Sequence, residues 1–296
     1  MLECVANVSE GRDAGVIDTL AAACRGSLLD VHSDTDHHRS VFTLAGPGSS
    51  DAESAARLLA GSVARLVSIA AHEGVHPRLG ALDVVPFVAL DDHDLPDRPD
   101  GPAEAAIAFA RWWSETFEVP VFLYGDAGPA PATLPEVRRS AFRSRQPDFG
   151  PAAPHRTLGA TAVGARPLLV AVNCDLASPS VHSARRIASS VRERDGGMPG
   201  VRALGLLLAS VGRAQVSMNL VDLAATGVEA AVSRVRELAL DEQTDVARVE
   251  LVGLLPRAEL DRCSGDFLAW TGLGVASTIE ERLASLRTRH GGEARR

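Results

Sequence analysis

The chain has 296 residues, of which 46% are hydrophobic, and its mean hydropathy of +0.05 is typical of a globular protein. Its net charge of −8 argues against nucleic acid as a partner, because such binding requires a basic surface. No apolar run reaches the ~18 residues of a membrane helix and no basic signal-peptide start is present, so we expect a cytoplasmic protein without a membrane partner. The four cysteines are widely spaced, which favours neither disulfides nor a zinc knuckle.

The first half of the chain predicts the element order β-α-β-β-α-β. Strands are predicted from short apolar runs between turn residues, and helices from apolar residues that recur every three to four positions. The predicted strands cover 2–5, 28–32, 40–44 and 82–90, and the predicted helices cover 13–24 and 51–72. A helix over 102–117, a strand over 119–124 and a short helix over 134–142 follow.

The same order begins again after residue 166. The predicted strands are 168–173, 201–208, 214–220 and 248–251, and the predicted helices are 180–194 and 227–240. This order is the one found in ferredoxin-like folds. We therefore predict an α+β protein built by duplication, with ferredoxin-like βαββαβ subdomains over 1–165 and 166–296 whose bare sheet faces pack around a substrate cleft. The charged tail 288–296 is expected to be frayed.

The sequence HEGVHPR at 72–78 is the most informative stretch, because it combines two imidazoles, a carboxylate and a guanidinium with Gly and Pro. Read as His-Glu-x-x-His on one helix, it would make His72 and His76 ligands of zinc, with Glu73 as general base. Gly74 and Pro77 argue against a continuous helix, because glycine weakens helices and proline disfavours helical geometry in the residue before it. The remaining interpretations are two surface histidines, or a catalytic histidine held in a stiff loop beside Arg78.

Three further loops are richer in polar or small residues than a core requires. Residues 7–12 follow a strand and precede a helix, where backbone N–H groups favour anions, although simple helix capping explains them equally well. Residues 32–39 include three histidines and two aspartates, which is a possible metal-binding set. Residues 147–166 are rich in Gly, Ala and Pro, and we favour a ligand loop over a linker because small residues let a ligand approach the backbone.

Five segments resemble those of the glutamate formiminotransferases. They are ECVANVSEG (3–11), GVHPRLGALD (74–83), PDFGP (147–151), GATAVGAR (159–166) and AQVSMNL (214–220). They occur in the family's order and span essentially the whole chain. The resemblance implies transfer of a formimino group between N-formimino-L-glutamate and tetrahydrofolate in histidine degradation, with tetrahydrofolate as co-substrate and no metal. The animal enzymes carry an additional cyclodeaminase, which is not expected here.

The resemblance also assigns roles to particular residues. The family's catalytic histidine falls on His76. Its folate-binding segment falls on Gly150, Pro151, Ala152, Ala153, Pro154, His155, Arg156, Thr157, Leu158 and Gly159. We expect the pterin to lie on this small-residue backbone, so that Gly159→Val would weaken folate binding at little cost to stability. At position 32 this chain has His, whereas the animal enzymes of the family have Asp. The acidic partner of His76 is therefore sought among Asp34, Asp36 and Asp83.

The implied chemistry agrees with these residue types. An imidazole with a pKa near 6.5 can take a proton from one nitrogen and return it to another, which suits His76. Both substrates carry carboxylates, which guanidinium groups bind well. The candidates for this role are Arg12, Arg39, Arg78 and Arg166, and a second cluster at 138, 139, 143 and 145 is either a contact for a polyglutamate tail or a solvated helix face.

Two other classes of function stay open. The first is a zinc-dependent hydrolase that uses His72 and His76, and the second is a folate-binding protein without catalysis. Metal analysis would identify the first, and turnover would exclude the second. The sequence also leaves open whether the chain forms a homodimer.

Overall fold

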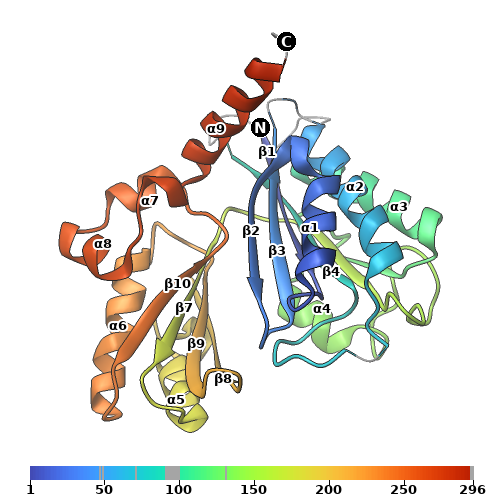
Figure 1. The fold of residues 1–296 in the computed structure, drawn as a ribbon. Helices are drawn as coiled ribbons and strands as arrows, with labels where there is room; N and C mark the ends of the chain where they lie inside the picture. The colour runs from blue at the N-terminus through green and yellow to red at the C-terminus, as the bar shows by residue number, and fades with distance from the viewer. Residues whose placement is uncertain (47, 49, 71, 91–100, 131, 294–296) are drawn as a thin grey trace. The chain divides into compact units, whose positions relative to one another are not determined.

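A computed structural model describes the chain except for residues 47, 49, 71, 91–100, 131 and 294–296. The chain forms two compact units, Met1–Pro167 and Leu168–Arg296 (Figure 1). In the described residues, no helix is both long and apolar enough to cross a membrane.

The first unit begins with the predicted β-α-β-β-α-β order. Its elements are β1 (Leu2–Val8), α1 (Ala14–Ala23), β2 (Leu28–Asp34), β3 (Arg39–Ala45), α2 (Asp51–Leu66) and β4 (Leu82–Ala89), with a 3₁₀ turn at Arg25–Ser27. These four strands lie in the order β2-β3-β1-β4, and all neighbours are antiparallel. That order is the ferredoxin-like one, because the first and last strands of the motif end up as neighbours in the sheet.

Two more strands extend this sheet beyond β4. The added elements are α3 (Pro102–Phe117), β5 (Val121–Gly125), α4 (Leu134–Ser140) and β6 (Thr161–Ala165). β6 pairs in parallel with both β4 and β5, which completes the order β2-β3-β1-β4-β6-β5. A buried chain of hydrogen bonds fixes this extension: Trp113 Nε1 of α3 donates to Thr161 Oγ1 (2.9 Å), which donates to Leu82 O (2.7 Å).

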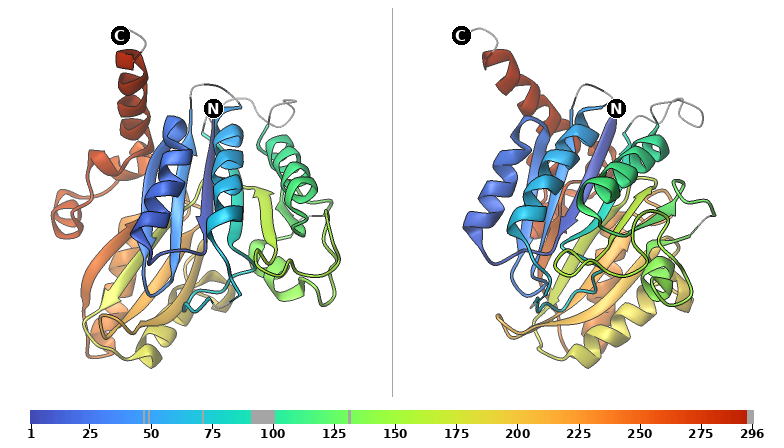
Figure 2. Two further views of the ribbon diagram at one scale, coloured as in Figure 1. Left: turned by 45° about the vertical axis from the view of Figure 1, so that its right-hand side comes forward. Right: turned by 90° about the vertical axis from the view of Figure 1, so that its right-hand side faces the viewer.

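The two faces of this sheet carry different helices. Alternate strand residues point to opposite sides, so Val121 and Leu123 join the core with α1, α2 and α3, whereas Phe122 and Tyr124 pack with Val137 of α4. The first three helices lie side by side over one face (Figure 2). α4 covers part of the opposite face, near β5 and β6.

The second unit repeats the motif without the extra strands. Its elements are β7 (Val170–Leu176), α5 (Val181–Val191), β8 (Val201–Leu208), β9 (Arg213–Leu220), α6 (Val228–Asp241) and β10 (Val246–Val252), with a 3₁₀ turn at Glu193–Asp195. The strand order is β10-β7-β9-β8, again antiparallel throughout and again ferredoxin-like. The predicted α+β class and the duplication are therefore confirmed.

Several local predictions were wrong. β6 and the C-terminal helices α7 (Arg257–Asp261), α8 (Gly265–Thr271) and α9 (Ile279–Glu293) were not predicted, nor was the 3₁₀ turn at Val275–Ser277. Residues 288–293, expected to be frayed, belong to α9, and 294–296 lie outside the described residues. α2 ends at Leu66 instead of residue 72, because Val67 is extended and the N–H of Ile69 bonds to Thr157 O (2.9 Å).

Candidate active site

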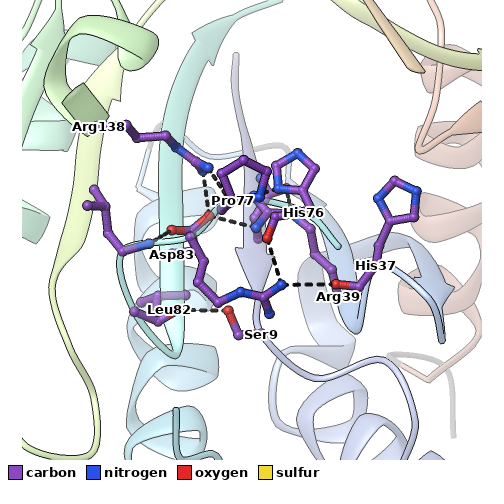
Figure 3. A network of polar contacts seen from close by, with 12 residues as sticks. Ser9, His37, Arg39, His76, Pro77, Leu82, Asp83 and Arg138 are labelled. Atoms are coloured by element: carbon purple, nitrogen blue, oxygen red, sulfur yellow. Dashed lines mark hydrogen bonds and ion pairs between the residues drawn. The ribbon is translucent and has the colours of Figure 1, made fainter. Parts of the chain in front are cut away.

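A buried network of three charged side chains lies at the start of β4. The Asp83 carboxylate is fully buried, and its Oδ2 accepts hydrogen bonds from Arg39 Nη1 of β3 (2.6 Å) and Arg138 Nη2 of α4 (2.5 Å). The N–H of Leu79 donates to Oδ1 (2.5 Å), and Arg39 Nε donates to Asn7 Oδ1 (3.0 Å). Figure 3 shows Arg39 and Arg138 beside Asp83. With two guanidiniums and one carboxylate, the network carries a net charge of +1.

His76 lies beside this network, in the connection between α2 and β4 (Figure 3). Its Nδ1 is 2.8 Å from Pro77 O, and the same carbonyl accepts a hydrogen bond from Arg138 Nη1. A carbonyl oxygen can only accept, so Nδ1 carries the hydrogen and Nε2 keeps its lone pair in the neutral ring. The ring of His37 lies 5.8 Å from that of His76, centroid to centroid. This arrangement leaves Nε2 as the basic atom.

The surroundings of His76 favour the neutral imidazole. Burial, together with the positive charges of Arg39 and Arg138, holds the pKa of His76 well below its ordinary value of 6.5, although Asp83 and the bond to Pro77 act in the opposite direction. A buried positive charge nearby makes a second one costly. His76 is therefore neutral at physiological pH and able to accept a proton.

Arg78 holds the loop of His76 against the turn between β2 and β3. Its Nη2 donates to His76 O (2.7 Å) and His37 O (3.3 Å), and its Nη1 lies 2.6 Å from Nδ1 of His72. The His72 ring stacks on His38 with centroids 3.9 Å apart. Burial and the neighbouring Arg78 lower the pKa of His72 to about 4. The guanidinium of Arg78, a predicted ligand of substrate carboxylate, is thus occupied by contacts within the protein.

The interpretation of 72–78 as His-Glu-x-x-His on one helix is wrong. α2 ends at Leu66, so His72 and His76 do not share a helix, and their rings have different neighbours: His38 and Arg78 for His72, Pro77 and His37 for His76. Among the residues that the structure describes, no group of three His, Cys, Asp or Glu side chains is arranged to hold a metal ion, and this includes the loop 32–39.

The other two arginine candidates each donate to a backbone carbonyl. Arg12 is exposed, and its Nε donates to Thr35 O (3.0 Å). Arg166 Nη1 donates to Pro167 O (2.9 Å), beyond the end of β6. For the loop 7–12, an anion site and simple helix capping were both left open. The N–H of Arg12 donates to the protein's own Glu10 (2.7 Å), and so does the N–H of Asp13, the residue after the loop (3.0 Å).

Of the three candidate acidic partners of His76, Asp34 and Asp83 have carboxylates that bind other groups. Asp34 Oδ1 caps the turn by accepting the N–H of His37 (2.6 Å), and Asp36 accepts the N–H of Val75 at its backbone carbonyl (3.1 Å). Asp83 is linked to the histidine indirectly, through Arg138 and the Pro77 carbonyl. A backbone carbonyl therefore orients His76 at Nδ1.

The predicted folate segment begins exposed and ends against the loop of His76. Residues 150–154 are exposed, whereas Leu158 and Gly159 are buried. His155 and Gly159 exchange backbone hydrogen bonds (2.8 and 2.9 Å) to close a tight turn. Ala81 N donates to Leu158 O (2.9 Å), which joins this turn to the residues that follow His76.

Gly159 is closely surrounded by the fold, which argues against the expectation that a side chain here costs little stability. Its backbone is left-handed (φ +69°), and a Cβ there would lie 2.4 Å from Leu79 O and 2.5 Å from Ile69 Cδ1. We expect Gly159→Ala to destabilise the protein by more than the ~1–2 kcal/mol that a left-handed backbone costs an ordinary residue. Gly212→Ala is the matched control, because its φ is +60° but the space around it is open. Urea unfolding measures the free energy of unfolding of both variants. Equal losses would contradict the close approach of Leu79 and Ile69 to Gly159.

The contacts of Arg138 with Asp83 and Pro77 could not be predicted from the sequence. The sequence placed this residue in an arginine cluster that was either a contact for a polyglutamate tail or a solvated helix face. In the structure its side chain is only 15% exposed and joins Asp83 to Pro77. The sequence predicted a short helix over 134–142 here, and in the structure α4 begins with a capping box of Thr133 and Glu136. Its pairing with Asp83 depends on tertiary structure.

Comparisons with known proteins identify the family of the chain. Residues 1–166 match the formiminotransferase domain, N-terminal subdomain, and residues 171–282 match the formiminotransferase domain. The chain is 32% identical to a glutamate formimidoyltransferase of Thermoplasma acidophilum, over 96% of this chain and 97% of that protein. A glutamate formimidoyltransferase of Streptococcus pyogenes is 34% identical over 88% and 90%. The formimidoyltransferase-cyclodeaminase of Mus musculus is 35% identical over 88% of this chain and 51% of its own length. The resemblance seen in the sequence is confirmed, and the chain belongs to the formiminotransferase family.

Proposed function

We propose that the protein is a glutamate formimidoyltransferase, which moves the formimino group between N-formimino-L-glutamate and tetrahydrofolate. The observation that carries the proposal is the neutral His76, oriented at Nδ1 by Pro77 O and basic at Nε2, in a chain that matches named glutamate formimidoyltransferases over almost its whole length. The alternatives of a zinc hydrolase and a binding protein without catalysis have no comparable support.

The reaction joins a nitrogen to the formimino carbon and releases another nitrogen from it. The attacking amine loses a proton and the departing amine gains one. His76 Nε2 accepts the first proton and returns it, while the hydrogen bond from Nδ1 to Pro77 O stabilises the ring as it becomes positively charged. The same cations that keep the resting imidazole neutral make the protonated form short-lived, so the proton is readily returned.

For the co-substrate, we propose the segment 150–159 as the binding strip. Its exposed first half is made of Gly, Pro and Ala, whose small side chains leave the backbone accessible, and its closing turn is joined by Leu158 O to Ala81 after the loop of His76.

Of the four arginine candidates for substrate carboxylates, Arg39 and Arg78 are engaged internally. Arg12 is the exposed one, and we assign it to this role.

A transfer assay tests the proposal. Incubation with N-formimino-L-glutamate and tetrahydrofolate is expected to yield glutamate and a formimino-folate in equal amounts, and to yield neither when tetrahydrofolate is omitted. A chelator is expected to leave the rate unchanged. Release of glutamate without tetrahydrofolate, lost on chelation, would identify a hydrolase instead, and binding of tetrahydrofolate without turnover would identify a binding protein.

A further inference from the structure

Arg138 joins the base to the buried carboxylate from outside the ferredoxin-like motif. It lies on α4, which is held by the capping box of Thr133 and Glu136 and by the buried Val137. One nitrogen of its guanidinium donates to Asp83 Oδ2 and the other to Pro77 O. Because Pro77 O also accepts the hydrogen bond of His76 Nδ1, the guanidinium lies one carbonyl away from the imidazole.

We infer that Arg138 is a positioning residue for His76: its hydrogen bond fixes the Pro77 carbonyl that orients the ring, and its charge favours the neutral imidazole. The inference rests on the proposed role of His76 in formimino transfer. It assigns α4 a part in catalysis that neither the sequence nor the family match gives to it.

Stability alone does not account for Arg138. Without it, Asp83 would still accept hydrogen bonds from Arg39 and from the N–H of Leu79. A second guanidinium adds an excess positive charge to a buried site, and burying charge costs more than an ion pair usually returns. Arg138 Nε is also buried without a hydrogen-bond partner in the described part of the chain, which adds a further cost. Groups that break packing rules in this way are found mainly at functional sites.

The charged and titratable side chains that face His76 come from three elements and from one turn. Arg39 on β3 and Arg138 on α4 are cations, Asp83 on β4 is an anion, and His37 lies against the ring from the turn between β2 and β3. Removing Arg138 takes away one of the two cations that oppose protonation. The pKa of His76 should therefore rise, and the ring should lose its fixed acceptor.

Two substitutions separate the charge of Arg138 from its geometry. Arg138→Met removes charge and donors but keeps the length of the side chain, and Arg138→Lys keeps the charge with a single donor group. Arg65→Met, an exposed position near the end of α2, is the matched control. The imidazole of His76 is titrated by NMR without substrate, with the signal assigned from His76→Gln, and kcat and KM are measured in the transfer assay.

We expect Arg138→Met to raise the His76 titration midpoint and to lower kcat about tenfold to a hundredfold with little change in KM, the size of loss typical of a displaced catalytic group. Arg138→Lys should keep the midpoint and lose less activity.

An unchanged midpoint in Arg138→Met, as in Arg65→Met, would overturn the inference. The inference would also be overturned if Arg138→Lys lost as much kcat as Arg138→Met and if both losses were explained by lower stability. If Arg138→Met does not fold, Arg138→Gln supplies the same comparison. Because the titration needs no substrate, it remains informative even if wild-type protein fails to transfer the formimino group.

Discussion

Replacing His76 with alanine is expected to lower kcat for formimino transfer by about 10²- to 10⁴-fold, the usual contribution of a positioned acid-base group. Nothing else in the network can take over. A guanidinium has no lone pair with which to accept a proton, and Asp83 is buried and paired with both Arg39 and Arg138. Binding of tetrahydrofolate should change little, because the segment 150–159 is joined to its neighbours by backbone bonds that do not involve the imidazole.

Steady-state kinetics and a tetrahydrofolate titration on the same preparation check this expectation. His182→Ala is the matched control, since His182 is exposed on α5 of the second unit and should keep full activity. Retention of more than about a tenth of the wild-type kcat in His76→Ala would rule out a catalytic role of the proposed size. Loss of folate binding together with kcat would point instead to a role in shaping the site.

Replacing Asp83 with asparagine is expected to lower the free energy of unfolding by about 3–5 kcal/mol, because removing one partner of a buried ion network leaves the others buried without compensation. Arg39 and Arg138 would both lose their counter-charge while their side chains stay 10% and 15% exposed. The carboxylate is the only anion of the network. Activity should fall as well, because both guanidiniums lie beside His76.

Urea unfolding at several pH values tests this expectation. Although burial alone would raise it, the pKa of Asp83 is lowered by Arg39, Arg138 and the N–H of Leu79. The carboxylate therefore stabilises the fold fully above its unfolded pKa of about 3.9, and this contribution is lost as the pH falls through the lower folded value. Glu53→Gln, which removes only the i,i+4 pair with Arg57 on α2, should cost no more than about 0.5 kcal/mol. Similar losses for Asp83→Asn and Glu53→Gln would mean that the buried network does not hold the fold.

The fold could be predicted where local patterns and tertiary structure agree. The helix over 102–117 has these bounds in the structure, since Pro102 stands at its first position and apolar residues recur along its length. β6 was missed because Thr161–Ala165 contains one large apolar residue, Val163, among small ones, a composition typical of loops. It becomes a strand because β4 and β5 pair with it on both sides. The early end of α2 also depends on a partner distant in sequence, Thr157.

The site was predictable only in part. His76 could be singled out from its Gly and Pro neighbours and from the resemblance to a family. Its electrostatic setting could not, because Arg39, Asp83 and Arg138 lie far apart in the sequence and meet only when β3, β4 and α4 are assembled. Arg78 was predicted to bind a substrate carboxylate because a guanidinium does so well, yet its neighbours are backbone carbonyls of the folded loop. Contacts with backbone carbonyls cannot be predicted from residue type or spacing.

The central claim is that a neutral His76 is the base for transfer, and one paired measurement tests it most directly. The pH dependence of kcat/KM reports the pKa of the essential base in the free enzyme, and NMR reports the titration of His76 in the same protein. We expect the acidic limb of the kcat/KM profile and the His76 titration to share one midpoint, well below 6.5, because burial, Arg39 and Arg138 lower the pKa of this imidazole. A His76 midpoint at or above 6.5, or an acidic limb that does not coincide with it, would contradict the account.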